Sequence, residues 1–257
     1  MDALEFRTCA EAAPADLRQK LIALPDIIAD WLAPHGGLDG CKVMDFGCGP
    51  GELAAGLAYA HPSSEVIGVE VTDEPSRLGG ILSAAGLASP SNLSFRDVPL
   101  GQVCDDTDFD VVVSWSVFEH IQRNQFDAVI GRLKTRIRPG GLLFMQVSPL
   151  FFSPEGSHLW VLGYTDWQHL TRELSEVRED LDASSLNDRQ RELHWKLLLR
   201  LNRFTAPDFE ARLCAAGFSV VRRQIDRIDR EPPPELLNAY DREALTTEQI
   251  VLLLRRD

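Results

Sequence analysis

A glycine-rich segment directly after a short apolar run is the feature that most limits what this chain can fold into. Residues 43–46 read as a buried strand that carries Asp45. Three glycines follow it at alternate positions: Gly47, Gly49 and Gly51. Glycine lets a backbone turn sharply and lets a ligand lie close to it. Because open α/β sheets bind ligands outside the carboxyl ends of their strands, the segment predicts a binding loop.

Strands and helices alternate on both sides of this loop. Expected helices cover residues 14–33, 52–60, 75–86, 124–137 and 206–216, the last capped by Gly217. Further strands are expected at 66–70, 93–95, 109–115, 142–147, 218–225 and 250–254. Pro139, Gly140 and Gly141 form an expected turn before the fifth strand. Such alternation is typical of βαβ units and of a parallel sheet with helices on both faces.

The pattern changes between residues 148 and 203, which are rich in aromatic and charged residues. We expect a helical cap inserted after the fifth strand, with most of its aromatic side chains forming its own core. Residues 171–194 are highly charged and predict an exposed helix within it. The expected organisation is an N-terminal helical segment (1–40) followed by one domain (41–257) that contains the cap.

Two acidic residues restrict which ligand the glycine loop can bind. A dinucleotide fold would place a glycine at position 52, where this chain has Glu52. An acid at a helix N-terminus repels the pyrophosphate that would bind there. S-adenosylmethionine has no phosphate and carries a positively charged sulfonium, so the loop fits that cofactor better. Glu70 closes the second strand and can accept hydrogen bonds from ribose hydroxyls.

Five segments in order resemble the class I (Rossmann-like) S-adenosylmethionine-dependent methyltransferases. They are VMDFGCGPG, VIGVE, LSFRDV, FDVVVSWSVFEHI and IRPGGLLF, within residues 40–150, and the resemblance returns at NRFTAPDFEARLCAAGFSVV. It implies a three-layer α/β sandwich around a mostly parallel seven-stranded sheet whose last strand is antiparallel. A weaker likeness, in SPLFFSPEGSHLW and DWQHL, is to methyltransferases that modify sugars or other hydroxyl-bearing small molecules.

The resemblance assigns the cofactor contacts. Asp45 and the three loop glycines would line its methionine end, and Glu70 with Val71 would hold the ribose. Asp97 would accept from the adenine amino group, and the Val98 backbone N–H would donate. Further expected contacts come from the end of the fourth strand and the turn after it, namely Ser114, Trp115 and His120. His120 has an equally good structural interpretation.

Removal of a proton from a hydroxyl acceptor requires a base. His158 and His169 are candidates because both lie in the expected cap and histidine titrates near neutral pH. Glu119, on the turn beneath the substrate, is the third candidate. For His158 and His169 the alternative is a structural role, as surface or packing residues. No carboxylate and histidine cluster with ligand spacing is visible in the sequence, so no metal is expected.

Composition restricts the partners. The chain has 26 basic and 39 acidic residues, a net charge of −13, which disfavours long nucleic acids and anionic membranes. No apolar run approaches the roughly 20 residues of a membrane span, and no signal peptide is visible. The five cysteines form no C-x-x-C pair, so reduced thiols and a cytoplasmic location are expected.

The functional hypothesis is therefore methyl transfer from S-adenosylmethionine to a small-molecule or glycan acceptor, at a hydroxyl. A non-catalytic scaffold that binds the cofactor is the main alternative, and methylation of nucleic acid or protein is less favoured. The sequence identifies neither the acceptor nor the oligomeric state.

Overall fold

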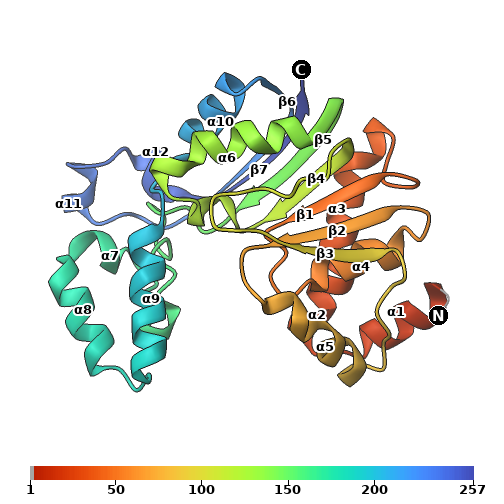
Figure 1. The fold of residues 1–257 in the computed structure, drawn as a ribbon. Coiled ribbons are helices and arrows are strands. Elements are labelled where there is room, and N and C mark those ends of the chain that lie inside the picture. Colours follow the sequence, from red (N-terminus) through yellow and green to blue (C-terminus); the bar gives the residue numbers. More distant parts are fainter. Residues whose placement is uncertain (1–2) are drawn as a thin grey trace. The chain divides into compact units, whose positions relative to one another are not determined.

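A seven-stranded mixed sheet organises the computed structural model, which describes residues 3–257 (Figure 1). The strand order is β3-β2-β1-β4-β5-β7-β6, with antiparallel last strands, so the expected fold class is confirmed. The strands are β1 (Lys42–Phe46), β2 (Glu65–Glu70), β3 (Leu93–Asp97), β4 (Phe109–Trp115), β5 (Ile137–Val147), β6 (Phe218–Arg227) and β7 (Thr247–Arg256).

Helical segments alternate with these strands. The α-helices are α1 (Ala3–Glu11), α2 (Ala15–Arg18), α3 (Leu24–Leu32), α4 (Glu52–Ala60), α5 (Leu78–Ala84), α6 (Arg123–Arg136), α7 (Gln168–Thr171), α8 (Leu174–Ala183), α9 (Asp188–Arg200), α10 (Ala206–Ala215), α11 (Pro234–Leu237) and α12 (Arg242–Thr246). Among the described residues, no helix is both long and apolar enough to cross a bilayer.

Strand β1 has parallel neighbours on both sides, and these fix where its loop emerges. Asp45 pairs with Gly68 of β2 and with Val113 of β4. The chain winds outward from β1 in both directions, so the glycine loop after it occupies the topological switch point of the sheet. Ligands of open α/β sheets bind at such a point.

The chain divides into two compact units that are described separately. One contains Met1–Trp115, Gly131–Met145 and Leu253–Asp257, and the other contains Ser116–Ile130 and Gln146–Leu252. Strands β5 and β7 pass through both units. The expected cap at 148–203 lies wholly within the second unit; its exact boundaries remain a prediction.

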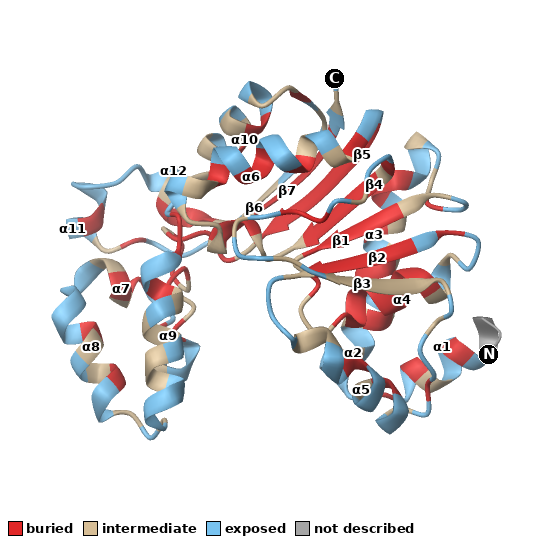
Figure 2. Ribbon diagram, in the orientation of Figure 1, coloured by how far each residue is buried: buried red, intermediate tan, exposed pale blue. Residues whose placement is uncertain are grey.

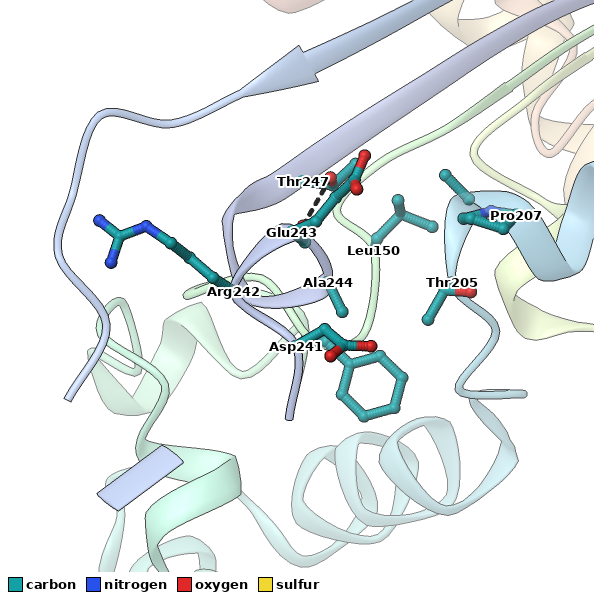
Figure 3. Close-up of a pocket in the computed structure, with 10 residues that line it drawn as sticks. Leu150, Thr205, Pro207, Asp241, Arg242, Glu243, Ala244 and Thr247 are labelled. Carbon is teal, nitrogen blue, oxygen red and sulfur yellow. Dashed lines mark hydrogen bonds between the residues drawn. The ribbon is translucent and has the colours of Figure 1, made fainter. Parts of the chain in front are cut away.

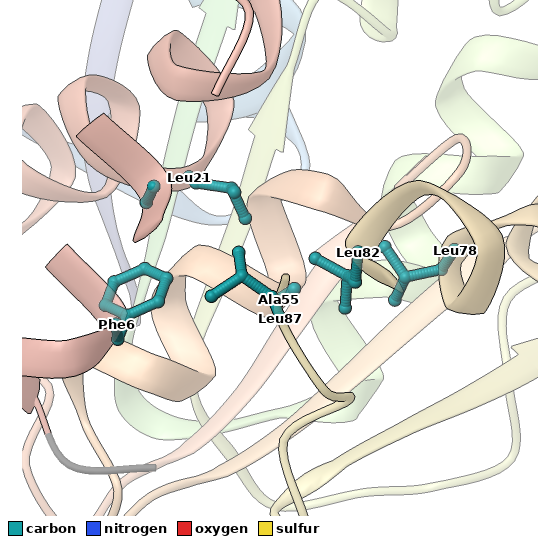
Figure 4. Close-up of a cluster of buried hydrophobic side chains, with 7 residues drawn as sticks. Phe6, Leu21, Ala55, Leu78, Leu82 and Leu87 are labelled. Carbon is teal, nitrogen blue, oxygen red and sulfur yellow. The ribbon is translucent and has the colours of Figure 1, made fainter. Parts of the chain in front are cut away.

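A hydrophobic cluster anchors the N-terminal helices in the first unit (Figure 4). Phe6 of α1 and Leu21 pack with residues of α4, α5 and the segment after α5: Ala55, Leu78, Leu82 and Leu87. Phe6 also stacks on Tyr59, with ring centroids 4.1 Å apart. Helix α1 lies within the expected N-terminal helical segment, but its bounds were not predicted, because Phe6 and Ala10 are too few buried apolar positions to reveal a helical period.

The expected helix at 14–33 is interrupted. A π-helical turn, η1 (Gln19–Ala23), separates α2 from α3, and a short 3₁₀ turn, η2 (Ala33–His35), follows. Pro25 has no N–H to donate to the Leu21 carbonyl, which disturbs the regular hydrogen-bond ladder. That carbonyl packs against Gly56 of α4, where a Cβ atom would lie 2.6 Å from it.

The expected turn at Pro139–Gly141 is wrong. Helix α6 ends at Arg136 and β5 begins at the next residue, so the glycines lie within the strand. Gly140 has φ +74°, which lets the strand bend there. Gly141 admits a close approach, since a Cβ atom on it would lie 2.6 Å from Ile137 Cγ2. The helix expected at 75–86 is a 3₁₀ turn (Glu74–Arg77) followed by α5, and the last strand is longer than the expected 250–254.

The region expected as a cap is helical and has its own core. Phe151, Tyr164, Val177 and Leu181 are buried in one cluster, while Trp167 packs with Leu236 and Leu245 in another. Of the six aromatic residues of this region, three are buried (Phe151, Tyr164 and Trp167), Phe152 and Trp195 are partly buried, and Trp160 is exposed. The single charged helix expected at 171–194 is instead two helices, α8 and α9, each with exposed outer faces (Figure 2).

Candidate functional site

The glycine loop turns through backbone conformations that favour glycine. Gly47, Gly49 and Gly51 have φ values of +76°, +52° and +94°. Gly51 is also closely covered, because a Cβ atom on it would lie 2.6 Å from the ring of Phe95. The same ring would lie 2.6 Å from a Cβ atom on Gly68 of β2. Phe95 therefore fits in a slot that exists only because both neighbours lack side chains.

Asp45 supplies a buried acid beneath this loop. Its side chain is 1% exposed, and burial followed by the nearby Glu70 charge raises its pKa to about 7. The Ala54 backbone N–H lowers the pKa in part, but Oδ2 has no hydrogen-bond partner among the described residues. An uncompensated buried carboxylate oxygen is costly, and a cationic or donating ligand would relieve that cost.

Glu70, at the end of β2, holds the loop through hydrogen bonds. Its Oε2 accepts from the Gly49 backbone N–H at 2.8 Å, and its Oε1 accepts from the Val71 N–H at 2.7 Å. The carboxylate is half-buried and keeps further lone pairs on both oxygens. Glu70 thus fixes the loop while remaining able to accept from a ligand. Val71 is 45% exposed at the same edge.

A small cavity of about 180 Å³ opens over the loop within the first unit. Its lining combines apolar and charged side chains: Lys20, Leu24, Asp45, Gly47, Cys48, Gly49, Pro50, Glu52, Leu53 and Trp115. Lys20 Nζ lies 3.3 Å from Glu52 Oε2, so this basic group is already paired. The remaining charge on the wall is that of Asp45, which favours a cationic ligand.

Two expected cofactor contacts need correction. The Val98 N–H is not free for adenine, because it donates to the Glu70 carbonyl at 2.9 Å and so extends the β2–β3 pairing. Ser114 is fully buried, and its hydroxyl donates to the Phe46 carbonyl at 3.0 Å. Ser114 therefore holds β4 against β1, while its neighbour Trp115 lines the cavity. Asp97 is exposed and lines a separate hollow with Arg96.

Glu119, His120 and His158 come together in the second unit. Glu119 and His120 lie on the 3₁₀ turn η4 (Phe118–His120), four and five residues after Trp115 in the sequence. One ligand-type atom from each of the three side chains lies within 4.8 Å of the others. The expectation that no carboxylate and histidine cluster exists is therefore wrong. It failed because His158 is 38 residues away in sequence and joins through tertiary packing.

Burial dominates the protonation of this cluster. It raises the pKa of Glu119 to about 8 and lowers that of His120. The pKa of His158 falls to about 3, first through burial and then through the neighbouring His120. At neutral pH both imidazoles are accordingly uncharged, which leaves a nitrogen lone pair on each ring to bind a cation.

Asn202 fixes the turn that carries Glu119 and His120. Its side-chain amide donates to the Phe118 carbonyl at 2.6 Å and to the Ile121 carbonyl at 3.2 Å. Its backbone N–H donates to the Glu119 carbonyl at 3.0 Å. Sequence reasoning missed this residue, although NRF stands at the start of the last matching segment, and only the fold shows what it contacts.

His169 does not join the cluster. Its Nε2 lies 2.6 Å from the Phe151 carbonyl, so this nitrogen carries the proton and donates. Burial lowers the pKa of His169 to about 4, and its ring packs against Phe151 with centroids 5.1 Å apart. Of the two histidines expected as bases, only His158 lies beside Glu119 and His120, while His169 keeps a buried Nδ1 that has no hydrogen-bond partner among the described residues.

A larger cavity of about 390 Å³ lies elsewhere in the second unit (Figure 3). Its walls come from the start of α10, the segment after β5 and the region of α12: Leu150, Phe152, Thr205, Ala206, Pro207, Asp241, Arg242, Glu243, Ala244 and Thr247. The Thr247 hydroxyl donates to the Glu243 carbonyl at 2.7 Å. None of the predicted site residues lines this cavity.

Comparison with known proteins places these features in a family. A family model described as "Methyltransferase domain" matches residues 10–223. The ubiquinone biosynthesis O-methyltransferase of Acinetobacter baylyi is 28% identical over 118 residues, 45% of this chain and 47% of that protein. The chain thus spans about half the length of the curated relatives it matches.

Solved structures share the fold at low sequence identity. Magnesium protoporphyrin IX methyltransferase from Synechocystis PCC 6803, solved with bound SAH, superposes with a TM-score of 0.52 and 18% identity, covering 91% of this chain and 82% of that one. A protein named as a cyclase superposes with a TM-score of 0.55 and 17% identity, covering 91% and 80%.

Proposed function

The chain belongs to the methyltransferase-domain family, and we propose that it moves a methyl group from S-adenosylmethionine to a hydroxyl oxygen of a small molecule. S-adenosylmethionine is the methyl donor. The observation that carries the proposal is the buried, unpartnered oxygen of Asp45 under a loop whose three glycines let a ligand lie against the backbone.

The residues present fit this cofactor. Asp45 and Glu70 offer acceptor oxygens at the end of adjacent strands, and the buried Glu52 adds negative charge where a phosphate would be repelled. Trp115 contributes an apolar wall, with its ring 6.2 Å from that of Phe144. Glycine loop, acids and aromatic wall would hold an uncharged adenosine joined to a sulfonium.

Methyl transfer to a hydroxyl requires the protein to align the two reactants and to remove a proton from the acceptor. When bound, the cofactor supplies an electrophilic methyl group on a positively charged sulfur. Binding and alignment of the two reactants can account for roughly 7–11 kcal/mol of the barrier. A hydroxyl acceptor must also lose its proton, and a positioned base contributes about 10²–10⁴-fold. The candidates for that base stay His158, His169 and Glu119, of which Glu119 and His158 lie together.

The acceptor class rests on the curated relatives. Several relatives that match this chain are named as O-methyltransferases of ubiquinone biosynthesis, which supports a hydroxyl of a small molecule. A glycan hydroxyl remains an alternative, supported only by the short likeness around His158. The net charge of −13 disfavours nucleic acid as acceptor. Five unpaired cysteines support a cytoplasmic setting.

The fold alone does not establish turnover, because a protein named as a cyclase shares it. The test is incubation of the purified chain with S-adenosylmethionine labelled in its methyl group and a panel of phenols, catechols and sugar alcohols. We expect label in at least one hydroxyl compound and an equal amount of S-adenosylhomocysteine. The matched control is the same compound with its hydroxyl replaced by hydrogen, which should stay unlabelled.

Label confined to sugar alcohols would favour the glycan alternative. Label that enters only amines would contradict the acceptor atom. Cofactor binding without transfer to any acceptor would favour a non-catalytic scaffold.

A further inference from the structure

We propose that Glu119, His120 and His158 form a binding site for one divalent transition-metal ion of the zinc type, with coordination positions left open. The site lies within the second compact unit, and its occupancy can be measured without a methyl acceptor.

Unused lone pairs converge at this point. Both oxygens of Glu119, Nδ1 of His120 and Nε2 of His158 are buried and have no hydrogen-bond partner among the described residues. Glu119 is only 3% exposed, and no lysine or arginine contributes to the shift of its pKa. Buried polar atoms are normally satisfied, so several unsatisfied acceptors facing one point indicate a missing positive charge.

The donor set matches a transition metal better than calcium or magnesium. Two imidazole nitrogens and one carboxylate are ligands of zinc and non-haem iron sites, whereas Ca²⁺ and Mg²⁺ take oxygen ligands. The ligand atoms lie within 4.8 Å of one another. Metal–ligand bonds of about 2.0–2.2 Å would draw them closer by roughly 1 Å, which small rotations of the side chains can supply.

The surroundings already orient the ligands. The His158 ring is hydrogen-bonded to the Pro149 backbone, and since Nε2 is unpartnered the proton lies on Nδ1. This arrangement leaves the Nε2 lone pair free, as in metal sites where the second ring nitrogen donates to a carbonyl. The rings of His120 and His158 meet edge to face, with centroids 4.9 Å apart, and Asn202 fixes the turn beneath them.

The partly exposed His120 leaves one side of the cluster accessible to solvent. His120 is only partly buried, whereas Glu119 is almost fully enclosed. Three protein ligands leave a fourth position for water or another oxygen, which is the arrangement of reactive rather than structural zinc sites.

The test uses the full chain without an affinity tag, stripped with a chelator and then titrated with Zn²⁺ by calorimetry. We expect one equivalent to bind with a dissociation constant of about 1 μM or tighter, raising Tm by mass action. Co²⁺ in its place should give visible d–d absorption bands typical of nitrogen and oxygen ligands.

Two variants and one control locate the ion. His158→Ala and Glu119→Gln should each weaken Zn²⁺ binding by at least about 100-fold, since loss of even an outer-shell partner costs about 10–100-fold. His194→Ala, a histidine of α9 outside the cluster, should bind as tightly as the wild type. Circular dichroism identifies any variant that fails to fold, in which case the other variant and the Co²⁺ spectrum decide.

No binding to the wild type up to about 1 mM Zn²⁺ would overturn the site. Equal affinity in folded His158→Ala and Glu119→Gln would overturn it as well.

Discussion

Replacement of Glu70 by alanine should weaken S-adenosylmethionine binding by about 30- to 150-fold. The change removes a charge-assisted acceptor for the ribose, worth about 2–3 kcal/mol, and 1.4 kcal/mol corresponds to tenfold in affinity. It also removes the oxygens that hold the Gly49 and Val71 N–H groups. Isothermal calorimetry of both proteins with S-adenosylmethionine measures the effect.

Glu65→Ala is the matched control, because Glu65 is an exposed acid at the opposite end of the same strand. Its affinity should equal that of the wild type. Glu70→Gln keeps an acceptor for the Gly49 N–H but removes the negative charge. It therefore distinguishes the loss of the loop hydrogen bond from the loss of the charged acceptor for the ribose. Unchanged affinity in Glu70→Ala would remove Glu70 from the binding site.

Gly51→Ala should lower the free energy of unfolding by roughly 1–3 kcal/mol. It should also weaken S-adenosylmethionine binding. The new Cβ atom would lie 2.6 Å from the Phe95 ring at a residue with φ +94°. The ring is already confined elsewhere, because a Cβ atom on Gly68 would also lie 2.6 Å from it. Thermal unfolding, followed by calorimetric titration with S-adenosylmethionine, gives both quantities.

Gly80→Ala is the control for this substitution. Gly80 lies within α5, and a Cβ atom there meets nothing within 4 Å. Alanine in a helix interior stabilises by about 0.5–1 kcal/mol relative to glycine. Equal stability and affinity in Gly51→Ala and wild type would show that the slot around Phe95 is looser than the structure indicates.

The sequence predicted the sheet well because local patterns carry that information. Alternating apolar runs located all seven strands, and the helix at 52–60 and the strand at 109–115 have the predicted bounds. The glycine loop and Glu70 were found because turn chemistry and strand-end acids depend on residues close together in the chain. The π-helical turn before Pro25 was missed, although the proline that disturbs the hydrogen-bond ladder there is visible in the sequence.

Site residues that depend on tertiary contacts were predicted less well. Residue type alone did not reveal that the Ser114 hydroxyl donates to the Phe46 carbonyl. It also did not reveal that the Val98 N–H donates to the Glu70 carbonyl. His158 and His169 look equivalent in sequence, yet the second donates to Phe151 and only the first joins Glu119. Such distinctions require knowledge of which backbone groups each side chain meets.

Titration of the purified chain with S-adenosylmethionine and with S-adenosylhomocysteine, by calorimetry, tests the central claim most directly. The account predicts one binding site for each compound, with dissociation constants in the micromolar range, about −8 kcal/mol. Absence of binding by either compound up to about 1 mM would mean that the glycine loop serves only the fold, and would contradict the proposed function.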